Sequence, residues 1–251
     1  MQRSFNLLFA LVAYAIFFAT FLYLIAFVGN LPVAPITVDR GPSAPIEIAL
    51  VINIGLIALF GLQHSTMARQ GFKKWWTRVV PWSAERSVYV LMASAMLIVL
   101  MTLWRPIDGT VWSVTGETAR VIVWSLFAIG WFVVLLSTFL INHFELFGLQ
   151  QAWLHFRGRQ GAAPEFRQPL LYRWVRHPLY LGFFIAFWAI PDMSYGHLLL
   201  SIGLSIYMLT AIRFEERDLV ALFGDRYVRY RVEVGMLVPR FGRREGMPPA
   251  E

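Results

Sequence analysis

The sequence predicts an all-α fold, a polytopic integral membrane bundle of five to six transmembrane helices in a single domain over residues 1–251. Of the 251 residues, 58% are hydrophobic and 15% are charged, whereas soluble domains are about 45–50% apolar and about 25% charged. The apolar residues form runs near the length of about 20 residues that crosses a hydrocarbon core. Lysine and arginine gather in alternate connections between these runs, which is typical of membrane proteins.

The chain holds six apolar runs. The predicted spans are residues 5–28, 47–67, 87–104, 119–141, 178–193 and 195–214. The first run is longer than the hydrophobic region of a signal peptide and lacks an A-x-A cleavage site, so we expect a true span. The fifth is short and contains Pro191, so it tilts little, thins the bilayer or stops short of crossing. The turn "PDMSYG" joins it to the sixth in a helical hairpin.

The distribution of lysine and arginine predicts the orientation. With the N-terminus in the cytoplasm, the inner segments are residues 1–4, 68–86, 142–177 and 213–251, which hold one, five, five and eight basic residues. Thus 19 of the 22 lie inside, as the positive-inside rule requires. The net charge of +7 is therefore explained by the inner leaflet, with no need for a nucleic-acid partner.

Residues 1–141 form the four N-terminal spans. A cytoplasmic connector follows at 142–177, then a hairpin and C-terminal helix at 178–240 and a tail at 241–251. Within the connector, "AWLHFRGRQ" is an amphipathic stretch that we expect to form a helix on the membrane surface. The chain has no cysteine, which excludes disulfides, cysteine-ligated metals and a thiol nucleophile.

Four of the five histidines lie near the predicted cytoplasmic boundary, namely His64, His143, His155 and His177. Polar groups at membrane depth are costly unless they are paired or functional. Their gathering on one side indicates a site facing the cytoplasm. The alternative is that each is a polar helix end meeting water, and this alternative stays open for "LINHFELFGLQ", which carries Asn142, His143, Phe144 and Glu145.

The stretch "RWVRHPLYLG" has the pattern of a helix start. Pro178 suits the first helical position, which places His177 at the N-cap and Arg176 just outside. Free N–H groups at such an end, together with Arg176, favour a carboxylate or phosphate. Tyr180 follows within the first turn, and Gly182 permits close approach of a ligand or a neighbouring helix. The alternative is a proline-started span whose arginine reaches the lipid headgroups.

Two adjacent carboxylates, Glu215 and Glu216, end the last span, where cations would favour simple lipid anchoring. They suit a cationic ligand or an internal ion pair with Arg213 or Arg217. After a helix stop at Gly224, Tyr227 and Tyr230 share one face of a short helix, an arrangement that also occurs as plain packing.

Several chemistries are not predicted. The sequence lacks a P-loop, G-x-G-x-x-G, G-x-S-x-G and H-E-x-x-H. The histidine spacing predicts no metal site. Charged residues are scarce within the spans, which argues against a channel or pump.

The motif Arg176-His177-Pro178-Leu179-Tyr180 with Gly182, followed after one hairpin by Glu215-Glu216, Leu219, Phe223-Gly224, Tyr227 and Tyr230, resembles the C-terminal signature of the isoprenylcysteine carboxyl methyltransferase-like superfamily. That superfamily also holds phospholipid N-methyltransferases and NnrU-like proteins. The chain is more similar still to its bacterial methanethiol S-methyltransferase branch. The segments that carry this similarity are "FVGNLPV", "LQHSTMARQGFKKWWTRVVP", "LSTFLINHFELFGLQQ" and "AIRFEERDLVALFGDRY".

The resemblance implies an enzyme of a bacterial inner membrane that methylates methanethiol to dimethyl sulfide with S-adenosylmethionine, leaving S-adenosylhomocysteine. It implies a cofactor site on the cytoplasmic side made of Arg176, His177, Tyr180, Gly182, Glu215, Glu216, Tyr227 and Tyr230. The partners expected are the thiol and the lipid bilayer, with no nucleic acid and no obligate protein partner.

A thiol is a poor nucleophile until it is deprotonated, so the site needs a base or a positive field. His143 is the first candidate for the base, because imidazole titrates near neutrality. Glu145 is the second candidate and His64 the third, with Asn142 and Phe144 as the wall of the acceptor pocket. Two alternatives stay open. One is a methyltransferase for a prenylcysteine carboxylate, a lipid amine or another small thiol, and the other is a non-enzymatic NnrU-like protein.

Overall fold

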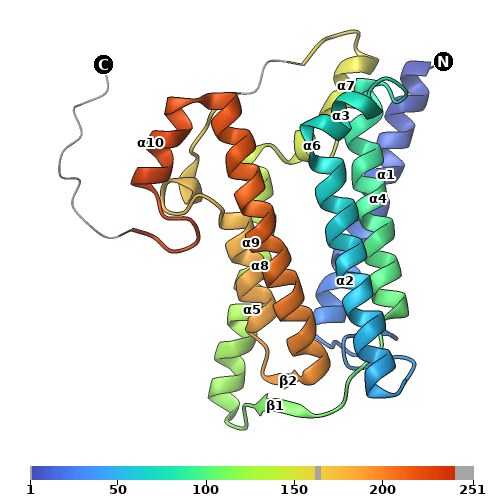
Figure 1. The fold of residues 1–251 in the computed structure, drawn as a ribbon, viewed down its shortest axis with the longest axis vertical. Coiled ribbons are helices and arrows are strands. Elements are labelled where there is room, and N and C mark those ends of the chain that lie inside the picture. Colours follow the sequence, from blue (N-terminus) through green and yellow to red (C-terminus); the bar gives the residue numbers. More distant parts are fainter. Residues whose placement is uncertain (1, 162–164, 241–251) are drawn as a thin grey trace.

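The computed structural model describes residues 2–161 and 165–240. Within them, five helices are long and apolar enough to cross a membrane. They are α1 (Gln2–Val28), α2 (Ile46–Ala68), α4 (Trp82–Leu103), α5 (Glu117–Ile141) and α9 (Tyr195–Phe223). They run side by side along the longest axis of the molecule (Figure 1). The polytopic helical membrane fold is therefore confirmed, and each of these helices includes nearly all of a predicted span.

The fifth predicted span is the exception. Its helix α8 (Pro178–Trp188) has 11 residues, about 16 Å at 1.5 Å per residue, which is half of a hydrocarbon core. The helix ends before Pro191, whose ring disfavours helical geometry in the residue ahead of it. A stretch of non-helical chain ahead of Pro178 completes the connection from the upper end of the bundle in Figure 1.

The turn expected between the last two spans is part of a small β-ribbon. Strand β2 (Asp192–Ser194) pairs antiparallel with β1 (Thr110–Ser113). The carboxylate of Asp192 also forms an ion pair with Arg120, at 2.7 Å. We call this end of the bundle the ribbon end.

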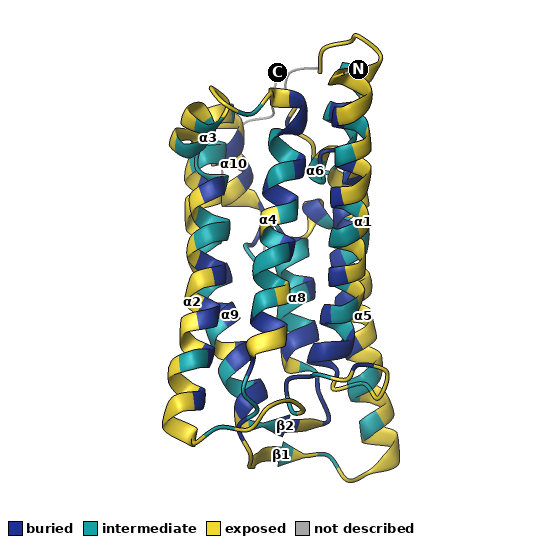
Figure 2. Cartoon of the chain, turned by 90° about the vertical axis from the view of Figure 1, so that its right-hand side faces the viewer, coloured by how far each residue is buried: buried dark blue, intermediate teal, exposed yellow. Residues whose placement is uncertain are grey.

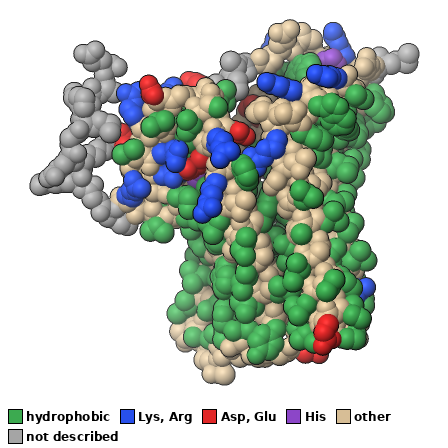
Figure 3. Space-filling model, in the orientation of Figure 1, with side chains coloured by type: hydrophobic (Ala, Val, Ile, Leu, Met, Phe, Trp, Pro, Cys, Tyr) green, Lys and Arg blue, Asp and Glu red, His purple; other side chains and the backbone are tan. Residues whose placement is uncertain are grey.

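The opposite end, which we call the basic end, carries the start of α1 and five short helical segments. They are α3 (Gln70–Trp76), α6 (His143–Leu146), α7 (Leu149–Phe156), the 3₁₀ turn η1 (Leu170–Arg173) and α10 (Asp225–Glu233). Figure 3 shows most of the visible lysine and arginine side chains gathered here, while hydrophobic side chains cover the length of the helices. Helix α7 includes part of the amphipathic stretch predicted from the sequence.

The burial pattern matches a bundle surrounded by lipid. Large apolar side chains such as Leu62, Phe132 and Val51 are exposed, and exposed residues line the outer faces of the helices in Figure 2. The main apolar core includes Phe27, Trp104 and Leu200, near the ribbon end. Two smaller apolar clusters, one around Tyr227 and one around Met67, lie toward the basic end.

Candidate functional site

The start of α8 lies against the chain that follows α10. The backbone N–H groups of Arg176 and His177 donate to the carbonyls of Gly235 and Met236, at 2.8 and 3.1 Å. Pro178 occupies the first turn, and no side chain caps the helix. The N–H groups of this turn therefore keep the partial positive charge of a helix N-terminus and can receive an anion.

Glu216 is the centre of a buried ion network. Its carboxylate oxygen Oε1 accepts from Nε of Arg176 at 2.7 Å and lies 3.1 Å from Nε2 of His177. Its other oxygen lies 3.2 Å from Nε of Arg231, on α10. The guanidinium of Arg176 also donates to the carbonyls of Arg231 and Val234. Glu216 is only 7% exposed. The positive charges of Arg176 and Arg231 offset the cost of burying its carboxylate.

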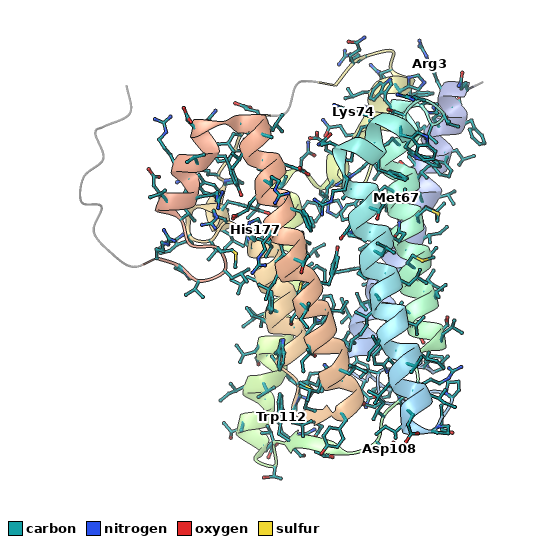
Figure 4. All side chains as sticks on the ribbon, in the orientation of Figure 1. Arg3, Met67, Lys74, Asp108, Trp112 and His177 are labelled. Carbon is teal, nitrogen blue, oxygen red and sulfur yellow. The ribbon has the colours of Figure 1, made fainter. Side chains whose placement is uncertain are left out.

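Tyr180 and Glu215 continue this polar site toward the rest of the bundle. The hydroxyl of Tyr180 donates to the exposed carboxylate of Glu215 at 3.1 Å. The ring of Tyr180 meets the imidazole of His177 edge-on, with centroids 5.7 Å apart. In Figure 4, His177 lies deeper along the bundle than Lys74 and Arg3. Irregular chain at such depth is tolerated where it is enclosed by protein or lines a polar cavity.

Tyr227 and Tyr230 form the core of the small unit built on α10. They pack with Phe166, and the hydroxyl of Tyr230 donates to the carbonyl of Tyr172 at 2.6 Å. Burial raises the pKa of both tyrosines above the usual value. The two rings are 2% and 4% exposed, so the structure gives them the packing role that the sequence had left as an alternative.

Gly182 allows α8 to pack closely against another helix. A Cβ at this position would lie 2.7 Å from both the carbonyl oxygen of Gly130 and the backbone nitrogen of Val134, on α5. A Cβ on Gly130 would in turn lie 2.6 Å from the backbone nitrogen of Ala186. The space beside Gly182 is therefore filled by α5, and the residue sets the position of α8 instead of facing a ligand.

His143 has partners for both ring nitrogens. Nε2 lies 2.8 Å from the hydroxyl of Tyr14, and Nδ1 lies 2.8 Å from that of Thr138. The imidazole stacks on Phe139 with centroids 4.1 Å apart, and burial lowers the pKa of His143. This geometry ties α1, α5 and α6 together through the imidazole, which differs from the free base expected from the sequence.

The neighbours of His143 also bond to one another. The backbone N–H of Glu145 donates to the side-chain oxygen of Asn142 at 3.3 Å, and the amide of Asn142 donates to the carboxylate of Glu145 at 2.8 Å. Asn142 thus caps α6. Phe144 is 54% exposed. None of these three side chains has a described contact with the network around Glu216.

His64 is the member of the predicted catalytic set that lies nearest the network. Its Nε2 is 2.8 Å from the hydroxyl of Tyr89, on α4. Tyr207, on α9, meets its ring edge-on, with centroids 6.1 Å apart. The carboxylate of Glu215 interacts electrostatically with both of these tyrosines.

Three residues of the site were missed by reasoning from the sequence, namely Tyr89, Tyr207 and Arg231. The two tyrosines stand among apolar residues within spans, and hydrogen-bonding groups there are often functional, so the signal was present. Arg231 carried no such signal, because it follows Tyr230 in a run of exposed charges.

The fold and the site define a multi-pass helical membrane protein with an enclosed ionic and aromatic site at one end, the architecture of a membrane-embedded enzyme. A methanethiol S-methyltransferase of Mycobacterium tuberculosis is 52% identical to this chain over 239 residues, 95% of this chain and 98% of the relative. Another of that name, from Crocosphaera subtropica, is 44% identical over 244 residues, 97% and 95% of the two chains. The chain belongs to the methanethiol S-methyltransferase family and is a methyltransferase.

More distant similarity points to the same membrane superfamily. Nurim of Bos taurus is 27% identical over 197 residues, 75% of this chain and 72% of the relative. No protein-family profile and no solved structure matches the chain.

Proposed function

We propose that this protein transfers the methyl group of S-adenosylmethionine to methanethiol, giving dimethyl sulfide and S-adenosylhomocysteine. The observation that carries the proposal is the uncapped start of α8 beside the network of Arg176, His177 and Glu216, in a chain 44–52% identical to methanethiol S-methyltransferases over nearly its whole length.

The residues present fit the polar groups of S-adenosylmethionine. Its carboxylate suits the free N–H groups of α8 and the guanidinium of Arg231, whose side chain is 46% exposed. Arg176, whose side chain is 8% exposed and bonded to protein groups, positions Glu216 and the chain after α10. The ammonium group and the ribose hydroxyls suit the exposed carboxylate of Glu215.

The ring of Tyr180 suits the sulfonium, since an aromatic face attracts a cation. When bound, the cofactor supplies an electrophilic methyl group on a positively charged sulfur. The residues of the site would hold the two ends of the cofactor, orient it and exclude water. Orientation of two reactants in a dry site accounts for much of the acceleration of such reactions.

We further propose that the basic end faces the cytoplasm of a bacterial inner membrane. Support comes from 19 of the 22 lysines and arginines, which fall in the segments assigned to this side. The start of α1 and the end of α10 then lie in the cytoplasm, and the cofactor site opens there.

Turnover by the purified protein tests the function. The protein in lipid nanodiscs is mixed with S-adenosylmethionine and methanethiol, and dimethyl sulfide is measured in the headspace by gas chromatography. We expect dimethyl sulfide and S-adenosylhomocysteine in equal amounts. Arg231→Ala should raise the KM for the cofactor about 10- to 100-fold, the cost of one hydrogen bond to a charged group. Arg229→Ala, an exposed neighbour on α10, is the matched control.

The alternatives are outcomes of the same experiment. Turnover on a prenylated cysteine or a lipid amine, with none on methanethiol, would assign a different acceptor. An absence of turnover together with no heat of binding for S-adenosylhomocysteine would refute the methyltransferase proposal.

A further inference from the structure

Three side chains from three different helices meet where α2 lies between α4 and α9. They are His64 of α2, Tyr89 of α4 and Tyr207 of α9. The hydroxyl of Tyr89 forms a hydrogen bond of 2.8 Å with Nε2 of His64, and Phe60 stacks on the same imidazole with centroids 5.3 Å apart. The ring of His64 is thereby fixed in orientation.

The other nitrogen of this ring is buried without a partner. Among the described residues, Nδ1 of His64 has no hydrogen bond, and the same is true of the adjacent buried amide oxygen of Gln63. Most buried polar atoms are hydrogen-bonded, and one left unpaired costs about 1–3 kcal/mol. A fixed ring with one free buried nitrogen is therefore suited to bind a ligand.

This cluster adjoins the proposed cofactor site. The carboxylate of Glu215 interacts electrostatically with the hydroxyls of Tyr89, Tyr180 and Tyr207. Tyr180 bonds to Glu215 directly. Glu215 thus joins the proposed cofactor site to the cluster around His64. In contrast, both nitrogens of His143 already have protein partners.

We propose that the acceptor thiolate binds at a subsite formed by His64, Tyr89 and Tyr207, with Nδ1–H of His64 donating a hydrogen bond to its sulfur. This inference rests on the proposed function and adds the acceptor site to it. With the ring proton on Nδ1, Nε2 accepts a hydrogen bond from the hydroxyl of Tyr89, which makes Tyr89 a positioning residue.

A positive charge lies beside the cluster. The guanidinium of Arg86 is 5.0 Å from the ring centroid of Tyr89. The same guanidinium favours an anionic sulfur nearby. The thiolate is also the reactive form of a thiol.

The reaction balances without a protein base. The proton of methanethiol passes to water at the basic end. A lone pair of the thiolate sulfur forms the new S–CH₃ bond, while the bond from the methyl group to the sulfonium breaks and leaves its electron pair on the sulfur of S-adenosylhomocysteine.

The aromatic walls match a small apolar acceptor. Tyr207 packs directly on Gly61 of α2, where a Cβ would lie 3.0 Å from Cδ2 of the ring. Phe60 and Tyr89 contact the other faces of His64.

The test compares initial rates over a range of methanethiol concentrations for the protein in nanodiscs, at saturating S-adenosylmethionine. We expect His64→Leu to lower kcat/KM for methanethiol about 10- to 100-fold, the range for a lost hydrogen bond to a charged group. His64→Asn, whose amide nitrogen can take the place of Nδ1, should keep most of the activity. Tyr89→Phe should raise the KM for the thiol with kcat little changed. His155→Leu, a histidine of α7 that packs on Trp82, is the matched control.

Binding of S-adenosylhomocysteine, measured by calorimetry, distinguishes this subsite from a defect in folding or in the cofactor site. We expect its affinity to stay within about twofold in all four variants, well below the cost of a lost hydrogen bond. A loss of that affinity in His64→Leu and His64→Asn alike would overturn the subsite. Wild-type kcat/KM in His64→Leu would do the same. If His64→Asn is as inactive as His64→Leu while binding the product normally, the ring acts as a proton acceptor and the donor role is wrong. An inactive wild-type protein would instead refute the proposed function.

Discussion

The contact between α5 and α8 sets the position of the site, and Gly182→Ala perturbs it directly. The new Cβ would lie 2.7 Å from two backbone atoms of α5. Ordinary contacts begin near 3.4 Å, so the two helices must separate by about 0.7 Å. Backbone cannot rotate out of the way as a side chain can. We expect the free energy of unfolding to fall by about 1–3 kcal/mol, the usual cost of overpacking.

The same displacement should reach the site, because His177 is the N-cap residue of α8 and its side chain contacts Glu216. A shift near 1 Å in a positioned group can lower turnover by up to about 100-fold. We expect Gly182→Ala to lower both the thermal midpoint in detergent and the rate of dimethyl sulfide formation.

Gly55→Ala is the matched control. Gly55 lies within α2, and a Cβ there would meet nothing within 4 Å. Alanine should therefore be neutral or stabilise the helix by up to about 1 kcal/mol. Equal thermal midpoints for Gly182→Ala and Gly55→Ala would refute the packing argument. If Gly182→Ala lost affinity for S-adenosylhomocysteine at an unchanged midpoint, the glycine would belong to the cofactor site after all.

Three further predictions concern the polar groups. Glu216→Gln leaves Arg176 without a buried counter-charge, so the free energy of unfolding should fall by about 3–5 kcal/mol. The thermal midpoint and the affinity for S-adenosylhomocysteine should both fall with it, and an unchanged midpoint in a thermal scan would contradict this. Burial lowers the pKa of His143 from the ordinary 6.5, so the unfolded chain binds the proton more readily than the folded protein. The contribution of His143 to stability is therefore present above about pH 6.5 and is lost as the pH falls toward the lowered pKa. As the pH falls from 8 to 5, the thermal midpoint should therefore fall less for His143→Phe than for the wild type. Equal falls in the two proteins would refute this. Tyr230→Phe should cost about 1–3 kcal/mol, because the carbonyl of Tyr172 loses its donor, with KM for the thiol unchanged; a changed thiol KM would place Tyr230 in the acceptor site.

The short segments show where prediction from the sequence stopped. The helical start at Pro178 was predicted, because proline fixes its own geometry locally. The end at Trp188 and the strand at Asp192 were not, since strand pairing with Thr110–Ser113 joins residues far apart in the chain. An ion pair of Glu216 was left as one alternative, with Arg213 or Arg217 as the expected partner. The structure instead pairs it with Arg176, just before α8, and with Arg231 on α10.

By itself, the sequence determined that this protein is a multi-pass helical membrane protein, where its long helices lie and which end carries the positive charge. These properties follow from hydropathy, length and charge, which act over one segment at a time. Only the tertiary structure decided which polar side chains meet. It gave His143 two protein partners and, within residues 2–161 and 165–240, left Nδ1 of His64 without one. Both histidines end an apolar run in the sequence, and what separates them is the neighbouring helix that each one meets.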